Sequence, residues 1–397
     1  MRVSKCVAVN AAGTLLVCLA VAALALVVYP AQNETRPGYV GDAKCLSCHP
    51  KQKEFPRTAH HLTSRIATRE SIVGSFAPGK NVLKTPEPEL QYRMEARDDG
   101  LFQTGVLGIA PHTVSISHRF DLVVGSGRKG QTYLYWGRAG DSGEADRLFQ
   151  LPVSYWTEIG GWVNSPGYGD RVVDFSRPVL ARCIECHGTY AETIDDPNAA
   201  NRYLKTKLVL GVTCERCHGP GAQHSNIHAV AGAKPADQAI VNPAKLPRDR
   251  QLDLCSLCHG GIGVAKTPVF SFKVGDALAD HLQLASPAAN DPLDVHGNQV
   301  ALLERSKCFK SSNMTCSTCH DVHTPQRDVV DFSSRCLTCH KIESCGLFPR
   351  RGKSVAGKCV DCHLPNQTSN VIFSTHAGAR IRPKVRNHWI KVYTVGR

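Results

Sequence analysis

One five-residue pattern, Cys-x-x-Cys-His, recurs along the chain and holds most of its chemically reactive side chains. It occurs at Cys45-Cys48-His49, Cys183-Cys186-His187, Cys214-Cys217-His218, Cys255-Cys258-His259, Cys316-Cys319-His320, Cys336-Cys339-His340 and Cys359-Cys362-His363. Positions i, i+3 and i+4 of a helical turn lie on one face. Each copy therefore presents two thiols and one imidazole side by side.

Repetition of the histidine distinguishes between the possible chemistries. A structural zinc site uses two Cys-x-x-Cys pairs for each ion and gives no reason for a histidine after each second cysteine. A thioredoxin-like redox pair would occur once, beside a βαβ pattern, and simple disulfides would not repeat the histidine. The pattern is instead typical of c-type haem, in which both thiols bond to the porphyrin and the imidazole binds its iron. The sequence therefore predicts seven covalently bound haem c groups, held by the fourteen motif cysteines and by His49, His187, His218, His259, His320, His340 and His363 as proximal iron ligands.

Histidine is also abundant outside the motifs. The chain has 18 histidines, of which eleven lie outside the motifs, whereas methionine, the other common axial ligand, occurs after Met1 only as Met94 and Met314. We therefore expect imidazole on both faces of the irons, and no catalytic residue. His224 and His323 follow their motifs closely and suit a neighbouring haem.

The net charge of +13 does not indicate nucleic-acid binding. Each haem carries two propionates, so we expect many Lys and Arg side chains to neutralise them. Six motifs lie between Cys183 and His363. So little polypeptide for each cofactor predicts that the porphyrin faces themselves form much of the buried apolar surface.

The N-terminal residues predict export. Arg2 and Lys5 precede an apolar stretch, residues 6–29, that is long enough to span a bilayer, and this positive flank places the following chain outside the cytoplasm. An uncleaved anchor is favoured over a cleaved signal peptide, because the apolar region is long and the cleavage site poor. Either alternative places the protein in the periplasm or on the outer face of the inner membrane.

We expect a mainly α and irregular multihaem fold with a small antiparallel β insertion. The predicted parts are a membrane anchor or signal peptide (1–30), a first haem-binding segment (31–70), a β-containing insertion (71–175) and a six-haem domain (176–397). Within the insertion, residues 81–100 indicate a loop or strand edge, and residues 112–156 alternate β-branched and aromatic runs with Gly-rich turns. The glycines at 125, 127 and 130 fit a hairpin turn rather than a dinucleotide site, since another strand follows them.

Two cysteines remain outside the motifs and the N-terminal segment. In an oxidising compartment, a leftover pair of cysteines is most simply a disulfide, so we expect one between Cys308 and Cys345. The alternative is two buried free thiols.

The stretches "CERCHGPGAQH", "MTCSTCHDVH" and "YVGDAKCLSCHPKQKEFPRTAHH" resemble those of multihaem cytochromes related to cytochrome c-554 and hydroxylamine oxidoreductase. The resemblance implies distal iron ligands at His60 or His61, His224, His296, His323 and His388, and His118 and His376 complete the set of candidates. No motif ends in lysine, as the catalytic motif of related nitrite reductases does, and no feature marks a cross-linked tyrosine.

The sequence thus predicts an exported electron-transfer cytochrome, with redox proteins or a quinone-linked donor as partners and a possible oligomer or larger complex. The alternative is a multihaem oxidoreductase that acts on a small nitrogen or sulfur compound at one five-coordinate haem.

Overall fold

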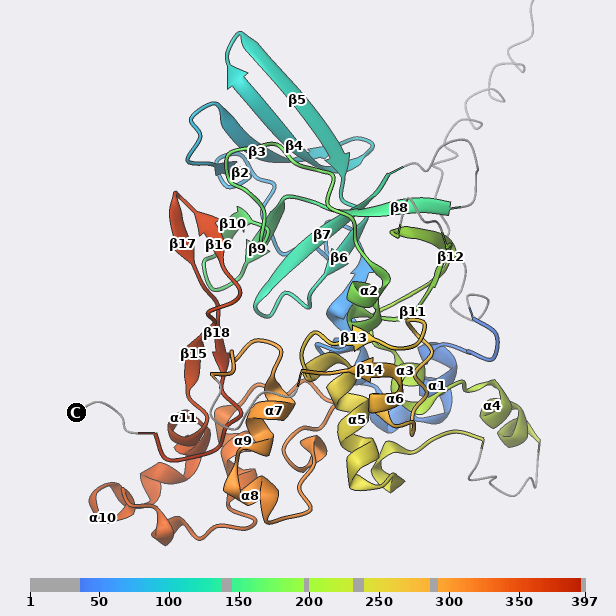
Figure 1. The fold of residues 1–397 in the computed structure, drawn as a ribbon, viewed down its shortest axis with the longest axis vertical. Helices are drawn as coiled ribbons and strands as arrows, with labels where there is room; N and C mark the ends of the chain where they lie inside the picture. The colour runs from blue at the N-terminus through green and yellow to red at the C-terminus, as the bar shows by residue number, and fades with distance from the viewer. Residues whose placement is uncertain (1–35, 138–144, 196–199, 231–238, 286–291, 394–397) are drawn as a thin grey trace, which may run out of the picture.

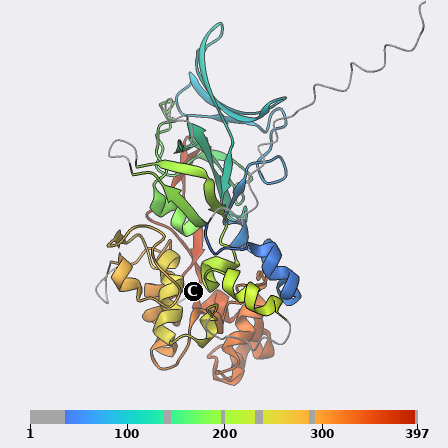
Figure 2. The same ribbon diagram turned by 90° about the vertical axis from the view of Figure 1, so that its right-hand side faces the viewer.

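The computed structural model describes residues 36–137, 145–195, 200–230, 239–285 and 292–393. A β-rich part lies above a helical part, and the C-terminal segment returns from the helical part to the β-rich part (Figures 1 and 2). The predicted N-terminal membrane or signal segment lies outside the described residues. Within the described ranges, no helix has the length and apolar character needed to cross a membrane.

The larger sheet is antiparallel and eight-stranded. Its main path is β1 (Ser64–Ile66), β6 (Leu122–Val124), β7 (Gly130–Gly137), β8 (Ala145–Gln150), β12 (Arg202–Leu210) and β11 (Gly188–Thr193), while β9 (Val153–Trp156) pairs with β7 and β10 (Gly161–Asn164) pairs with β9. The expected hairpin turn connects β6 to β7, where Gly125 and Gly127 adopt positive φ angles of 103° and 85°. Such angles favour glycine because it has no Cβ.

The second sheet has four antiparallel strands in the order β2 (Val82–Lys84), β3 (Leu90–Arg97), β4 (Gly100–Ile109) and β5 (His112–Arg119). Side chains alternate between the two faces of β3. Leu90, Tyr92 and Met94 point inward and are buried, whereas the residues between them carry polar side chains. These side chains join a core that both sheets share and that contains the aromatic residues Phe76, Tyr92, Phe120, Tyr133 and Trp162.

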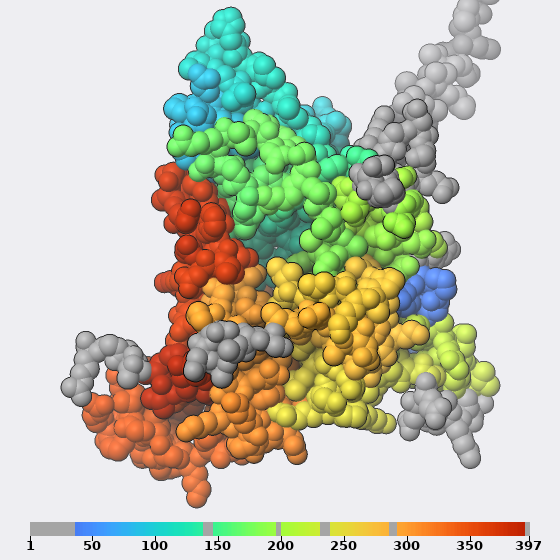
Figure 3. All heavy atoms as spheres, viewed as in Figure 1, coloured from blue at the N-terminus to red at the C-terminus, as the bar shows by residue number. Residues whose placement is uncertain are grey.

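The helical part consists of short helices joined by irregular chain. They are α1 (Asp42–Cys48), α2 (Ala181–His187), α3 (Cys214–His218), α4 (Ala222–Ala229), α5 (Arg248–His259), α6 (Leu278–His281), α7 (Gln299–Glu304), α8 (Lys307–Lys310), α9 (Val329–Cys336), α10 (Phe348–Arg351) and α11 (Cys359–His363). Three two-stranded sheets accompany them: β13 (Val264–Ala265) with β14 (Leu282–Gln283), β15 (Asn366–Thr368) with β18 (Lys384–Arg386), and β16 (Ser374–His376) with β17 (Ala379–Ile381). In Figure 3 the C-terminal strands lie along the flank of the β-rich part.

The expectation of a mainly α fold with a small β insertion is wrong. Strands rival helices in extent, and the larger sheet includes β1, β11 and β12, which lie outside the predicted insertion at 71–175. Residues 90–97, expected to be a loop or strand edge, form β3. The physical reason is that a Cys-x-x-Cys-His pattern requires only one or two helical turns, so seven copies leave most of the chain free to pair as strands.

Two buried carboxylates join the first and third motifs. Glu215, which is 2% exposed, accepts hydrogen bonds from the backbone N–H groups of Val40, Gly41 and Gly221 at 2.8, 3.0 and 2.9 Å. In return, Asp42 at the start of α1 accepts a 2.9 Å hydrogen bond from the backbone N–H of Cys214. These bonds attach the chain before motif one to the helix of motif three.

Replacing Glu215 by alanine should therefore destabilise the fold. Three buried N–H groups would lose their acceptor, so we expect the free energy of unfolding to fall by about 3 kcal/mol, and by less for Glu215→Gln. Urea unfolding followed by circular dichroism measures this change. Glu158→Ala, at an exposed position, is the control. Equal stability of Glu215→Ala and this control would contradict the assigned role.

Candidate functional site

Each Cys-x-x-Cys-His pattern forms a single helical turn. Four copies lie at the ends of α2, α3, α5 and α11. In the other three, the histidine backbone N–H donates to the carbonyl of the first cysteine at 2.9 Å, as between His49 and Cys45, His320 and Cys316, and His340 and Cys336. The predicted common face of two thiols and one imidazole is therefore present in the backbone.

Four motif imidazoles each face an imidazole from a distant segment. The ring centres are separated by 6.2 Å for His49 and His224, 6.1 Å for His218 and His323, 6.1 Å for His259 and His60, and 6.3 Å for His320 and His388. Two metal–nitrogen bonds of about 2 Å, plus roughly 1.2 Å from each nitrogen to its ring centre, place axial imidazoles about 6.4 Å apart. The four pairs therefore fit a metal ion bound between the two rings.

His187 lies near a fifth non-motif histidine, His296. Burial lowers the pKa of His187, and the proximity of His296 lowers it further. The Nδ1 atom of His187 is 2.9 Å from the hydroxyl oxygen of Thr63, which fixes the direction of the ring. Thr63 follows the segment of His60, so one loop orients the ring of His187 and supplies the ring opposite His259.

Hydrogen bonds to backbone carbonyls orient two further motif rings. His218 Nδ1 lies 2.8 Å from the carbonyl oxygen of Val241, and His363 Nδ1 lies 2.8 Å from that of Lys391. A ring that donates from Nδ1 leaves Nε2 for a metal. This arrangement matches the usual support of a metal-bound histidine.

Burial favours the neutral form of five of the paired imidazoles. It lowers the pKa of His259 to about 4, with His60 the next cause, and lowers the pKa of His320 to about 4, with His388 the next cause. Burial also lowers the pKa of His60, His218 and His388. The neutral form is the one that binds iron.

Three of the predicted distal candidates have other surroundings. His61 directs Nε2 to Asp42 Oδ2 at 3.1 Å, so of the adjacent pair it is His60 that faces a motif ring. The ring of His118 packs against Tyr135 and Phe175 at 4.0 and 4.7 Å between ring centres. His376 Nδ1 lies 3.0 Å from the carbonyl oxygen of Trp162 in β10. No ring contact in the described residues joins any of the three to a motif histidine.

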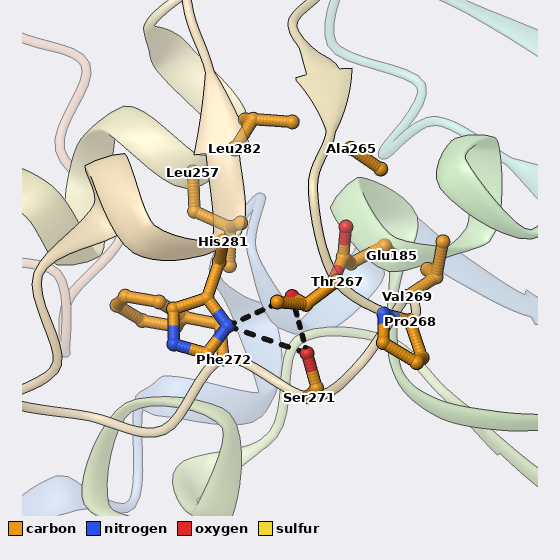
Figure 4. Close-up of a pocket in the computed structure, with 10 residues that line it drawn as sticks. All are labelled: Glu185, Leu257, Ala265, Thr267, Pro268, Val269, Ser271, Phe272, His281 and Leu282. Atoms are coloured by element: carbon orange, nitrogen blue, oxygen red, sulfur yellow. Dashed lines mark hydrogen bonds between the residues drawn. The ribbon is translucent and has the colours of Figure 1, made fainter.

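Another non-motif histidine, His281, lines a small pocket (Figure 4). Its Nδ1 lies 3.0 and 3.3 Å from the hydroxyl oxygens of Thr267 and Ser271, and its Nε2 lies 3.0 Å from Asp276. Both ring nitrogens are thus engaged, so the ring has a structural role.

The thiols of successive motifs lie near one another in an unbroken series. Thiols interact between motifs one and three, three and four, two and four, four and five, five and six, and six and seven, through the pairs Cys45–Cys214, Cys217–Cys255, Cys186–Cys258, Cys255–Cys316, Cys319–Cys336 and Cys336–Cys359. Motif four contacts three others and so forms a branch point.

Residues between the motif cysteines hold this series together, and the sequence analysis missed them. Glu185 in motif two, 5% exposed, is 2.9 Å from Arg182 and accepts a 2.7 Å hydrogen bond from the Phe270 N–H. Arg182 in turn donates to the carbonyl of Leu257 in motif four at 2.7 Å. A carboxylate between the two cysteines, as at Glu185 and Glu215, was the available signal.

The predicted disulfide is not present in the structure. Cys308 and Cys345 are both free thiols. Cys308 lies near Cys319 and Cys336, whereas Cys345 lies near Cys359. Each thiol thus lies near at least one motif cysteine.

Comparisons with known proteins agree with these motifs. The family model "Cytochrome c554 and c-prime" matches residues 172–219, which contain motifs two and three. The chain is 22% identical to the C-type polyheme cytochrome OmcC of Geobacter sulfurreducens over 49% of this chain and 27% of that protein. It is 33% identical to the C-type polyheme cytochrome OmcB of the same species over 27% of this chain and 15% of that protein. The chain thus spans about a quarter or less of the length of these relatives, and no solved structure matches it significantly.

The motifs and these similarities together support a multihaem c-type cytochrome with covalently bound haem c. Among the described residues, no group of three or more His, Cys, Asp or Glu side chains is arranged to hold a metal ion by itself. The facing imidazoles fit haem iron instead.

Two histidine substitutions test the assignment of the pairs. His388→Ala removes the ring that faces His320, so its haem should gain a high-spin ferric signal, and carbon monoxide should bind one more haem than in the parent protein. His376→Ala, the matched control from the same C-terminal segment, should leave both readouts unchanged because His376 contacts the carbonyl of Trp162. Electron paramagnetic resonance and Soret titration measure the two effects. An unchanged His388→Ala protein would overturn the pairing.

Proposed function

We propose that this chain is an exported seven-haem cytochrome that carries single electrons along its series of motifs. The observation that carries the proposal is the set of four facing imidazole pairs, each with ring centres 6.1–6.3 Å apart. Haem c, when bound, supplies reversible one-electron chemistry at iron. The protein supplies the ligands, keeps their imidazoles neutral and sets the order of the sites.

In this proposal, the facing rings would hold the haem irons together with the motif rings. His224 would serve the haem of His49, His323 that of His218, His60 that of His259, and His388 that of His320, while His296 would serve that of His187. Imidazole on both faces favours low reduction potentials relative to Met/His ligation. The contacts between successive motifs support transfer over short distances from motif one or motif two to motif seven.

The C-terminal end of the series fits a docking site for a redox partner. In motif six, Cys339 and His340 are exposed. The segment that follows, residues 341–358, bears five exposed cations, Lys341, Arg350, Arg351, Lys353 and Lys358, and one acid, Glu343. This excess of positive charge suits an acidic redox protein. The N-terminal segment would hold the cytochrome at the outer face of the membrane, near a quinone-linked donor.

A second function has a specific observation in its favour. His340 and His363 face no other imidazole at ring-contact distance within the described residues, unlike the four paired motif rings. A haem with one open position at either site would suit an oxidoreductase that acts on a small nitrogen or sulfur compound.

The cofactor content tests the number of haems. If all seven motifs are filled, the purified protein should contain seven irons per chain, and acid–acetone should extract almost no haem because thioether bonds hold it. Intact mass spectrometry and iron analysis give the count. Fewer than seven attached haems would contradict the proposal.

Carbon monoxide binding separates the two functions. An electron carrier with every iron six-coordinate should keep its reduced Soret band under carbon monoxide and show only low-spin ferric signals. Binding to one or two haems in seven, with a matching high-spin signal, would favour the oxidoreductase.

A further inference from the structure

The hairpin of β4 and β5 exposes an apolar surface beyond the core. Four side chains form it and are called here the hairpin patch: Leu107, Ile109, Val114 and Ile116, which are 45, 66, 70 and 48% exposed. The hairpin projects from the top of the β-rich part (Figure 1). Contiguous exposed apolar side chains of this kind mark interaction sites more often than single ones do.

The hairpin patch and the core-facing residues lie on the same face of the sheet. This face packs against the core at the base of the hairpin. Cross-strand partners share a face, and the register pairs Leu107 with Val114, Gly105 with Ile116, and Gln103 with His118. At the base, Gln103 is fully buried and His118 contacts Tyr135 and Phe175. Toward the tip, the same face has no cover from the described residues.

The opposite face of the hairpin is polar. Thr104 and Ser117 share a 2.8 Å hydroxyl contact, and Arg97 donates to both hydroxyls at 2.9 Å. The hairpin therefore has a face of mainly polar side chains, where Val106 is the apolar exception, and an uncovered apolar surface on the other face. Since its polar face is satisfied, any partner belongs on the apolar side or along the free edge.

The edge strand itself is open to pairing. β5 is the last strand of its sheet and pairs only with β4 in the described structure. Proteins commonly protect such edges with charged residues, yet residues 112–118 (HTVSISH) contain no Asp, Glu, Lys or Arg. The strand thus combines free backbone groups and an apolar flank, and its one Asp, Glu, Lys or Arg residue is Arg119 at its last position.

The pattern of β5 is symmetric about Ser115. Val114 and Ile116 flank this serine, and Thr113 and Ser117 flank them in turn. An antiparallel strand related by a two-fold axis at Ser115 would place each valine opposite the partner's isoleucine and each threonine opposite the partner's serine. A one-residue slip would instead place apolar residues opposite polar ones.

From this juxtaposition we propose that two copies of the chain associate through β5, pairing edge to edge about Ser115 and merging their two hairpin patches. The occupant is a second copy because the strand is complementary to itself in polarity and carries no like charges that would meet. The two four-stranded sheets then form one continuous sheet with an unbroken apolar strip on one face. This association does not depend on the number of haems or on their ligands.

Matched lysine substitutions on the two faces test the interface. The parent holoprotein should sediment as a concentration-dependent dimer. Val114→Lys should weaken the dimer by roughly tenfold or more, because symmetry makes each change act twice. Thr113→Lys adds the same charge one residue away on the polar face and should have little effect. Both positions are exposed, so neither change should impair folding, which haem content and circular dichroism verify.

A cross-link tests the register. Ser115→Cys should give a covalent dimer under mild oxidation, since the two cysteines would lie opposite each other at the two-fold axis. Thr113→Cys, which would lie opposite the partner's serine, should form far less of it. Three outcomes would overturn the proposal: a parent protein that stays monomeric up to its solubility limit, a dimer that Val114→Lys leaves intact, or equal cross-linking of the two cysteine variants.

Discussion

The separation between facing imidazoles is the constraint on which the arrangement of this chain depends. Each pair joins a motif to a segment far away in sequence, as His49 with His224 and His218 with His323 do, and holds the ring centres about 6 Å apart. A pair with this spacing fixes two pieces of chain as firmly as a cross-link once metal binds between them. Metal bound in this way would reduce the number of apolar side chains that the helical part needs. The buried apolar cluster of this part, within residues 254–284, is small.

The β-rich part positions one of these pairs. β1 begins directly after the loop that carries His60, and Ser64 at its start donates to the carbonyl of His187 at 2.5 Å. The backbone N–H of Val212 also donates to the His60 carbonyl at 3.0 Å. The apolar cluster in which Ile66 of β1 packs with Leu122 and Leu134 thus holds this loop between motifs two and four. A rigid sheet supports ligands that short helices alone would leave loosely placed.

The sequence was sufficient to find the motifs and the candidate histidines, because both depend on residue type and local spacing. His60, His224, His323 and His388, which face motif rings, were all among its candidates. It could not separate His60 from His61, since the difference lies in Asp42, which approaches His61 only in the folded chain. The extent of the sheets was missed for a similar reason: β12 pairs with β8 across more than fifty residues, and local composition carries no record of that partner.

The interleaving of the pairs also determines when each site can be completed. A chain is made from its N-terminus, so His49 emerges long before His224, and His218 long before His323. The ring of His49 can therefore meet its facing ring only after 175 further residues have been made. Motif four is the exception, since His60 precedes His259 and is already present when that motif appears. The His60–His259 pair can therefore close second, after His49–His224 and before the pairs completed by His323 and His388. The branch point at motif four can thus form before the C-terminal sites do.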